Sequence, residues 1–120
     1  MNMSWKDEMK LGDIYLVEFP QIGGHEQMGK RPAIIVQGRE YNLPTVLIVP
    51  LTTKVKALDF AGTILIKPDN RNHLDEESVA LAFQLRAIDR KRLSKKIGEI
   101  KVEQITKLQD LIKQLLRMAD

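Results

Sequence analysis

The sequence contains no cysteine and only two histidines, His25 and His73. The lack of cysteine excludes disulfides and thiolate metal sites, and two imidazoles argue against a zinc site. No apolar run is longer than a few residues, which is too short to span a membrane. The N-terminal stretch MNMSWKDEMKLGD lacks the apolar centre of a signal peptide, so we expect a cytoplasmic protein. We also expect the protein to need no metal or other cofactor.

The composition is that of a soluble globular protein, with 43% hydrophobic and 29% charged residues. A chain of 120 residues suits one compact domain. Residues 1–10 mix charges and methionines without a period. We therefore expect a flexible N-terminal arm over residues 1–10, followed by a single domain over residues 11–120.

The net charge of +3 is mild, but the basic residues are unevenly distributed. Residues 84–96, here called the basic segment, contain only Asp89 as an acidic residue. Its basic residues are Arg86, Arg90, Lys91, Arg92, Lys95 and Lys96. Such a cluster is compatible with a nucleic-acid partner, and a solvated turn explains it equally well.

Short apolar runs predict strands at residues 12–19, 32–38, 45–53, 62–68 and 78–88, with a last short strand around 96–100. Pro50 in the third run indicates an edge position, a bulge or a bend, and the fifth run could be broken near Gln84. Apolar residues at three- and four-residue steps in 101–118 predict an amphipathic helix of about five turns. Together these elements predict a mainly β fold with a C-terminal helix, built as a strongly bent sheet or partial barrel.

A polar loop between the first two predicted strands concentrates acid–base and anion-binding side chains. Its sequence, GGHEQMGKRP, includes His25, Glu26, Gln27, Lys30 and Arg31. Arg31, restricted by the proline that follows it, offers a fork of donors suited to a phosphate. His25 can exchange protons near neutral pH, and Glu26 could orient a neighbour or act as a base. The alternative is a polar surface loop without a function.

Thr52 and Thr53 follow Pro50 at the end of the third predicted strand. Threonine hydroxyls at a strand end could donate to a phosphate oxygen. The commoner alternative is a turn in which the hydroxyl binds the local backbone.

Gln84 and Arg86 are two residues apart in the fifth predicted strand, so we expect them to share a face. The amide suits a base edge, and the guanidinium suits a phosphate or a guanine. An ion pair of Arg86 with Asp89 or Glu77 is the alternative.

The sequence has no phosphate-binding glycine motif, dinucleotide fingerprint, HExxH or GxSxG. RNA, however, carries its own nucleophile in the 2′-hydroxyl. An enzyme that cleaves RNA through it needs only a base, an acid and cationic stabilisation of the phosphorane. His25, Glu26, Arg31 and Thr52 would cover these roles if the fold brings the loop next to the end of the third strand.

The strings GDIYLVEFP, GHEQMGKRPAIIV, LIVPLTT, ESVALAFQLRAID and KKIGEI, in this order, resemble the MazF/PemK family of toxins from type II toxin–antitoxin modules. The resemblance runs from about Leu11 to the C-terminal helix. It implies a small SH3-like β-barrel of the CcdB/PemK/MazF-like kind and a homodimer. It also implies a metal-independent, sequence-specific endoribonuclease (mRNA interferase) that acts on single-stranded RNA, and a cognate antitoxin that covers the RNA groove.

The resemblance assigns roles to individual residues. Arg31 matches the arginine that contacts the scissile phosphate and does acid–base work, and Thr52 matches the threonine that steadies this phosphate. His25 matches a position implicated in RNA cleavage or binding in the Kid-like branch, and is the third catalytic candidate. The expected supporting or RNA-binding residues are Glu26, Gln27, Lys30, Thr53, Gln84 and Arg86.

Phe83 departs from the family pattern, because several relatives have an acidic residue there to which the Kid-like branch assigns base work. Leu81 stands where that branch has an arginine. The base would then be Arg31, His25 or Glu26, and the sequence leaves base and acid unassigned. Two alternatives stay open: a non-catalytic or gyrase-inhibiting CcdB-like toxin, and an RNA-binding module that uses the basic segment.

Overall fold

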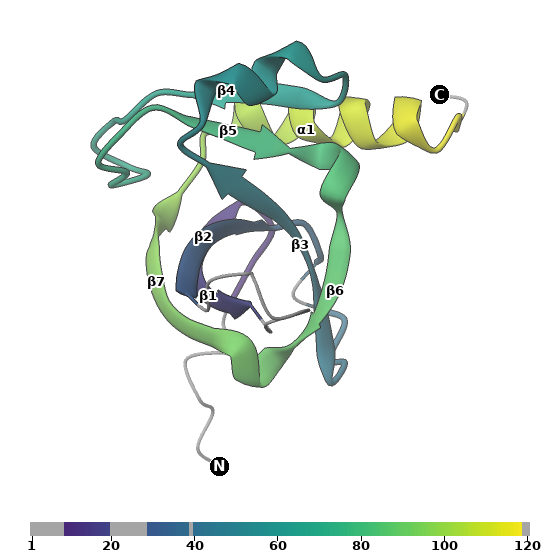
Figure 1. The fold of residues 1–120 in the computed structure, drawn as a ribbon. Helices are drawn as coiled ribbons and strands as arrows, with labels where there is room; N and C mark the ends of the chain where they lie inside the picture. The colour runs from purple at the N-terminus through teal and green to yellow at the C-terminus, as the bar shows by residue number, and fades with distance from the viewer. Residues whose placement is uncertain (1–8, 20–28, 39, 119–120) are drawn as a thin grey trace, which may run out of the picture.

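The computed structural model describes residues 9–19, 29–38 and 40–118, which form a seven-stranded sheet and a C-terminal helix (Figure 1). The strands are β1 (Asp13–Phe19), β2 (Gly29–Ile35), β3 (Thr45–Thr52), β4 (Thr63–Ile66), β5 (Ser78–Leu81), β6 (Arg86–Asp89) and β7 (Leu93–Glu99). The helix is α1 (Val102–Leu115), and short 3-10 helices lie at η2 (Val55–Asp59), η3 (Ala82–Gln84) and η4 (Arg90–Arg92). The expected mainly β fold with a C-terminal helix is therefore confirmed.

All strand pairings are antiparallel, in the order β4-β5-β3-β2-β1-β7, and β6 also pairs with β3. The strands curve round one another as in a small barrel (Figure 1), but among the described residues the hydrogen-bonded path is open between β4 and β7. Along one side, β3 pairs with β6 up to Ile48 and with β5 from Leu51. Buried Pro50 lies at this change of partner and is paired with Ala33 of β2 on the other side of β3. Because β3 has paired strands on both of its sides, the expected edge position is wrong, and the bulge and the bend stay predictions.

The apolar residues on both faces of β1 serve two separate cores. The first, here called the barrel-side core, includes Tyr15, Val17, Phe19, Ala33, Ile35, Ile48 and Ile88. The second, the helix-side core, includes Ile14, Ile34, Val49, Leu51, Ile100 and Leu108. Because successive strand residues point to opposite faces, each strand position can be assigned to one core or the other. This assignment locates the functional side chains below.

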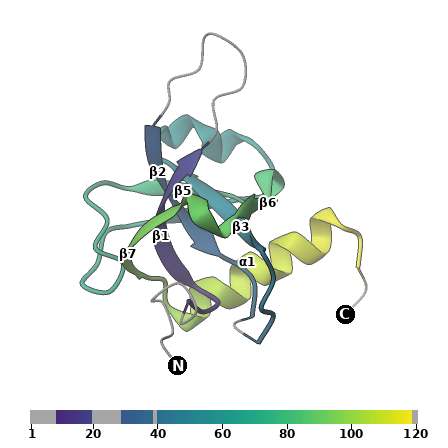
Figure 2. The same ribbon diagram turned by 90° about the horizontal axis from the view of Figure 1, so that it is seen from below.

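The helix α1 lies along one side of the sheet, and its C-terminal end projects past the strands (Figures 1 and 2). Its 14 residues make about four turns rather than the five expected. The helix ends because Arg117 has a positive φ of 56° and the N–H of Met118 donates to the carbonyl of Lys113 at 2.8 Å. This is a Schellman cap without its usual glycine. Among the described residues, no helix is long and apolar enough to cross a membrane.

Several expected boundaries differ from the structure. β2 begins at Gly29, inside the polar loop, and β7 begins at Leu93 rather than near residue 96. The run 78–88 is divided by η3, so the break expected near Gln84 is confirmed. Met9 is 3% exposed and packs into the barrel-side core, so packed structure begins before the expected arm boundary at residue 10. The rest of that arm, residues 1–8, lies outside the described residues.

Gly98 on β7 lies against the backbone of a neighbouring loop. A Cβ at this position would be 2.4 Å from the carbonyl oxygen of Arg71 and 2.6 Å from that of Asn72. Since backbone atoms cannot move aside cheaply, Gly98→Ala should lower the free energy of unfolding by about 1–3 kcal/mol, as measured by urea denaturation. Gly29→Ala is the matched control, because its Cβ would meet nothing within 4 Å. Equal losses in the two variants would contradict this prediction.

Candidate functional site

Two arginines that are distant in the sequence share one aromatic ring. The guanidinium carbon of Arg31, on β2, lies 4.7 Å from the ring centroid of Phe19, and that of Arg86, on β6, lies 5.7 Å from the same centroid. Phe19 is the last residue of β1 and is only 6% exposed, whereas both arginines are exposed. These distances are those of cation–π contacts. The ring therefore brings two positive groups together at the edge of the barrel-side core.

The strand register brings Thr52 to the same face as Arg31. β2 and β3 pair with Ala33 opposite Pro50, so these two residues point to one side of the sheet. Arg31 is two residues before Ala33 and Thr52 is two residues after Pro50, so both keep that side. The end of the polar loop and the end of the third strand thus present Arg31 and Thr52 to a common face.

The two threonines have different surroundings. The hydroxyl of half-buried Thr52 accepts a hydrogen bond from the N–H of Lys54 at 3.2 Å, which is the local turn considered as the alternative. Accepting this bond leaves the hydroxyl proton able to donate to a ligand. Thr53 is exposed and points to the opposite face, where it lines a cavity together with Pro32. Of the pair, only Thr52 shares the face of Arg31.

The expectation that Gln84 and Arg86 share a strand face is wrong. Gln84 is exposed in the 3-10 helix η3, and Arg86 begins β6, so the alternation of a strand does not connect them. The alternative, an ion pair of Arg86 with Asp89 or Glu77, is not found within the described part of the chain either. The carboxylate of Asp89 instead accepts from the N–H of Lys91 at 2.9 Å.

The remaining loop residues divide into described and undescribed ones. Lys30 is exposed, and its Nζ donates to the hydroxyl of Ser94 on β7 at 3.3 Å. This contact reaches across β1, which lies between β2 and β7 in the sheet. His25, Glu26 and Gln27 lie outside the described residues, so their roles stay predictions.

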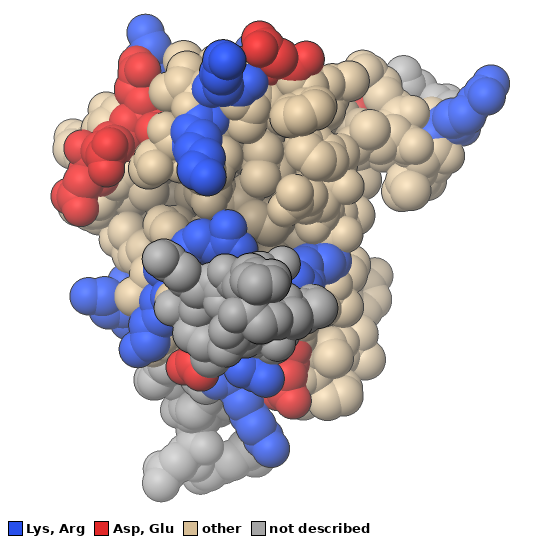
Figure 3. All heavy atoms as spheres, in the orientation of Figure 1, with Lys and Arg blue, Asp and Glu red and all other residues tan. Residues whose placement is uncertain are grey.

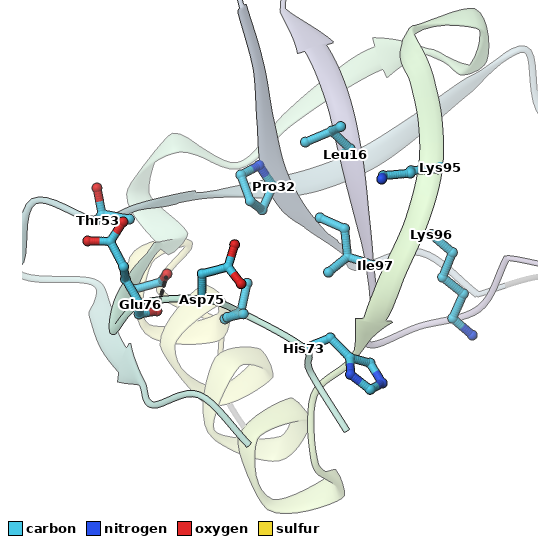
Figure 4. A pocket seen from close by; sticks show the side chains of 11 residues that line it. Leu16, Pro32, Thr53, His73, Asp75, Glu76, Lys95, Lys96 and Ile97 are labelled. Atoms are coloured by element: carbon cyan, nitrogen blue, oxygen red, sulfur yellow. Dashed lines mark hydrogen bonds between the residues drawn. The ribbon is translucent and has the colours of Figure 1, made fainter. Parts of the chain in front are cut away.

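A cavity of about 470 Å³ lies on the other face of β1 and β2, where Leu16 and Pro32 line it. Figure 4 shows Asp75 and Glu76 on one side of it and Lys95 on the other. Neither Arg31 nor Thr52 lines this cavity. Because its charges are of both signs, it suits a polyanion less well than the face with Arg31 does. In the described ranges, no three His, Asp or Glu side chains are placed to hold a metal ion.

Arg90 and Arg92, two of the six basic residues in the basic segment, make contacts within the fold. Arg90 donates from Nε to the carbonyl of Leu43 and from Nη2 to that of Tyr41, and Arg92 lies 3.8 Å from the carboxylate of Glu18. Figure 3 shows Lys and Arg side chains over β7 and around the middle of this face, with Asp and Glu gathered near the connection between β4 and β5. Arg90 and Arg92 are thus engaged in contacts within the protein, which weakens the hypothesis of an RNA-binding module that uses this segment.

Comparison with known families decides the identity. Residues 10–116 match the family described as PemK-like, MazF-like toxin of type II toxin-antitoxin system. The chain belongs to this family. The match covers β1 to α1, including Arg31, Thr52 and Arg86, and the resemblance found in the sequence is confirmed.

Solved structures of PemK/MazF-like toxins have the same fold. MazF from Deinococcus radiodurans superposes with a TM-score of 0.74 at 26% identity, covering 92% of this chain and 97% of that chain. A MazE–MazF complex from the same organism gives 0.74 at 23% identity, with the same coverage. An endoribonuclease in complex with its cognate antitoxin, from a mycobacterial species, gives 0.72 at 18% identity and covers 93% and 98%. At 23% and 18% identity, the similarity to the last two structures shows a shared fold only.

Phe19 was not among the site residues expected from the sequence. The signal that could have found it is the hairpin register, in which Val17 pairs with Arg31 and Phe19 with Gly29. Phe19 and Arg31 are then diagonal neighbours across β1 and β2, within reach of long side chains. The contact with Arg86 depends on the curvature of the sheet and has no counterpart in the sequence.

At the opposite end of β1, a network of ion pairs joins β7 to its neighbours. Glu99 lies 2.6 Å from Arg71, 3.3 Å from Lys10 and 3.5 Å from Lys96. Lys96 also lies 3.2 Å from the carboxylate of Asp13, which is 1% exposed. Hydrogen bonds from Arg71 and Lys10 lower the pKa of Glu99 from 4.5 to about 2. In this toxin fold the network anchors the start of β1 to the end of β7.

The pKa of Glu99 predicts a pH-dependent stability. The pKa of Glu99 in the folded protein lies below its ordinary value of 4.5, so between these two pKa values the unfolded chain binds more protons than the folded one. The ionised carboxylate therefore stabilises the fold fully above pH 4.5, and this stabilisation is lost as the pH falls towards 2. We expect Glu99→Gln to cost about 1 kcal/mol at neutral pH, and the difference from the wild type to vanish as the pH falls from 4.5 towards 2. Urea denaturation at several pH values measures it, and Arg71→Met should behave alike. A difference independent of pH would refute it.

Proposed function

We propose that the chain is the toxin of a type II toxin–antitoxin module and that it cleaves single-stranded RNA as a sequence-specific endoribonuclease without a metal ion. The observation that carries this proposal is the common face of Arg31 and Thr52, with Arg86 beside Arg31 on the ring of Phe19. Membership of the PemK/MazF-like family and the name of the mycobacterial endoribonuclease support it.

The chemistry follows from what each group can do. When the 2′-oxygen attacks the adjacent phosphorus, negative charge grows on the non-bridging oxygens of the phosphorane. Arg31 donates to these oxygens with a charged fork, and the hydroxyl proton of Thr52 donates to one of them. The 5′-oxygen then leaves with a proton, so the products are a cyclic phosphate and a 5′-hydroxyl end.

Proton transfer needs a base for the 2′-hydroxyl and an acid for the leaving oxygen. A guanidinium keeps its charge at neutral pH, so Arg31 suits the stabilisation of charge better than proton abstraction. His25 and Glu26 are then the candidate bases. Gln27, Lys30 and Gln84 are supporting RNA contacts in this proposal, and Arg86 adds a second cation. The face of Thr53 argues against a direct role at the phosphate.

The proposed partners are RNA, a cognate antitoxin protein and a second copy of the chain. The antitoxin is supported by the MazE–MazF complex and by the mycobacterial endoribonuclease bound to its cognate antitoxin. The homodimer is proposed from the family resemblance. An antitoxin that lies over Arg31 and Arg86 would compete directly with RNA.

The proposed activity is tested by incubating the purified protein with long single-stranded RNA in EDTA and sequencing the new 5′ ends. We expect cleavage that persists in EDTA, 5′-hydroxyl ends, and one short sequence around the cut sites. A deoxyribose at the cut position should block the reaction, because it removes the nucleophile. Intact RNA, or cleavage that requires a divalent metal ion, would overturn the proposal.

A second candidate function, a non-catalytic or gyrase-inhibiting CcdB-like toxin, is favoured by the surroundings of Phe83. This residue, 42% exposed, stands where several relatives have an acid, and its ring centroid lies 5.7 Å from that of Phe60, which is 64% exposed. Exposed aromatic pairs suit protein partners. Inhibition of gyrase supercoiling with intact RNA would support this candidate, and RNA cleavage without inhibition would exclude it.

A further inference from the structure

We infer that Phe19 is a positioning residue, which holds Arg31 and Arg86 together as one binding site for a phosphodiester of the RNA backbone. The inference rests on the proposed endoribonuclease function and adds two things to it. It assigns a role to a nearly buried apolar residue, and it makes Arg86 a partner of Arg31 rather than a separate surface contact.

The ring of Phe19 is held by the fold. It belongs to the barrel-side core with Val17 and Ala33, and only 6% of the residue is exposed. Arg31 and Arg86 come from different strands, β2 and β6, and both reach this ring, at 4.7 Å and 5.7 Å from its centroid. The sum of these two distances is an upper limit on the separation of the guanidinium carbons. A fixed ring therefore sets the position of two otherwise long and exposed side chains.

The paired cations are not neutralised by the described part of the protein. There, no ion pair joins Arg31 or Arg86 to a carboxylate. Of the carboxylates on β1 and β6, Glu18 pairs with Arg92, Asp13 pairs with Lys96, and Asp89 accepts from the N–H of Lys91. Two like charges near one ring repel each other, and an anion that contacts both removes this repulsion. The arrangement thus favours an anionic ligand.

The donor geometry favours a phosphodiester. Each guanidinium has five N–H donors in a plane, and a phosphodiester offers two non-bridging oxygens that accept such donors in pairs. A ring beneath a guanidinium restricts its motion, so less entropy is lost when the phosphate binds. As the charge on the phosphate rises in the transition state, donors that are already in place give more stabilisation than mobile ones.

The test uses four variants and a probe that cannot be cleaved. Phe19→Leu keeps an apolar side chain and removes the ring, Phe19→Tyr restores the ring, and Arg31→Ala and Arg86→Ala remove each cation. The probe is a single-stranded RNA with 2′-O-methyl riboses, bound to the wild type and the variants in fluorescence anisotropy titrations. Phe19→Leu should weaken binding roughly 5- to 30-fold, and Phe19→Tyr should bind like the wild type.

Double-mutant cycles separate positioning from packing. If the ring acts through the cations, Phe19→Leu should cost much less in the Arg31→Ala and Arg86→Ala backgrounds than in the wild type. Arg71→Ala is the matched control, because Arg71 is held by Glu99 and not by the ring, and its cycle with Phe19→Leu should be additive. In the cleavage assay, Phe19→Leu should lower kcat as well as raise KM, and Phe19→Tyr should restore both.

The outcomes distinguish the inference from the function on which it rests. Cleavage by the wild type with additive cycles at Arg31 and Arg86 overturns the role of Phe19 and leaves the ribonuclease in place. Coupled cycles with no cleavage of any natural RNA support the phosphodiester site and overturn the ribonuclease. If an acidic peptide binds with the same coupling while the RNA probe does not, the site is one for a protein partner and the inference is wrong.

Discussion

Arg31→Ala should lower the rate of RNA cleavage by about 100- to 1,000-fold and leave the melting temperature close to that of the wild type. The large kinetic effect is expected because the guanidinium stabilises charge that develops only in the transition state. The small thermal effect is expected because the side chain is exposed and makes no ion pair within the described part of the chain. Its contact with the ring of Phe19 contributes only about 0.5–1 kcal/mol at an exposed site. Initial rates on a cleavable oligonucleotide and a thermal melt measure the two quantities.

Arg71→Ala is the matched control for this prediction. It removes the same chemical group from the 2.6 Å ion pair with Glu99, away from the ring of Phe19. This variant should melt at a lower temperature and cleave RNA at the wild-type rate below its transition. Arg31→Ala should therefore lower the cleavage rate and not the melting temperature, whereas Arg71→Ala should lower the melting temperature and not the cleavage rate. Wild-type cleavage by Arg31→Ala would exclude the proposed mechanism, and a joint loss of activity and stability would make Arg31 a structural residue.

The regular parts of the fold could be predicted from the sequence. The apolar runs located β1 and β3 closely because both strands are buried on both faces, which leaves an unbroken signal. The helix was found from its period, but its end was not, because Arg117 adopts the left-handed conformation usually left to glycine. The start of β7 at Leu93 was missed because its first residues continue the basic segment, whose composition indicates a turn.

The candidate site could be predicted in part. Arg31 and Thr52 were selected from their chemistry and from the family pattern. Their position on a common face, however, depends on the register of β2 against β3, and this register cannot be deduced from the sequence of either strand alone. The grouping of Gln84 with Arg86 failed because a 3-10 helix interrupts what looks like one strand. Phe19 was missed because an aromatic at a strand end is ordinarily a core residue, and its contact with two arginines is a property of the curved sheet.

Leu108→Ala should lower the free energy of unfolding by about 2–5 kcal/mol, the largest loss of stability that we expect from one substitution. Leu108 is the only buried residue in α1 and is 2% exposed within the helix-side core. Its neighbours there include Ile34 and Ile100, and the adjoining turn of α1 packs so closely that a Cβ on Gly12 would be 2.5 Å from Ile105. This tight packing prevents the site from closing over the lost volume, which makes the cavity costly.

The matched control for Leu108→Ala is Leu116→Ala, because Leu116 is 59% exposed just after the end of α1 and should cost within about 0.5 kcal/mol. Urea denaturation of both variants measures the contrast, and similar losses would mean that α1 is not anchored through Leu108. Below its melting transition, Leu108→Ala should still cleave RNA at the wild-type rate. The reason is that α1 packs on the helix-side core, whereas Arg31 and Thr52 lie on the other face of the same strands. A loss of cleavage in a folded Leu108→Ala would show instead that the two faces are coupled through β2 and β3.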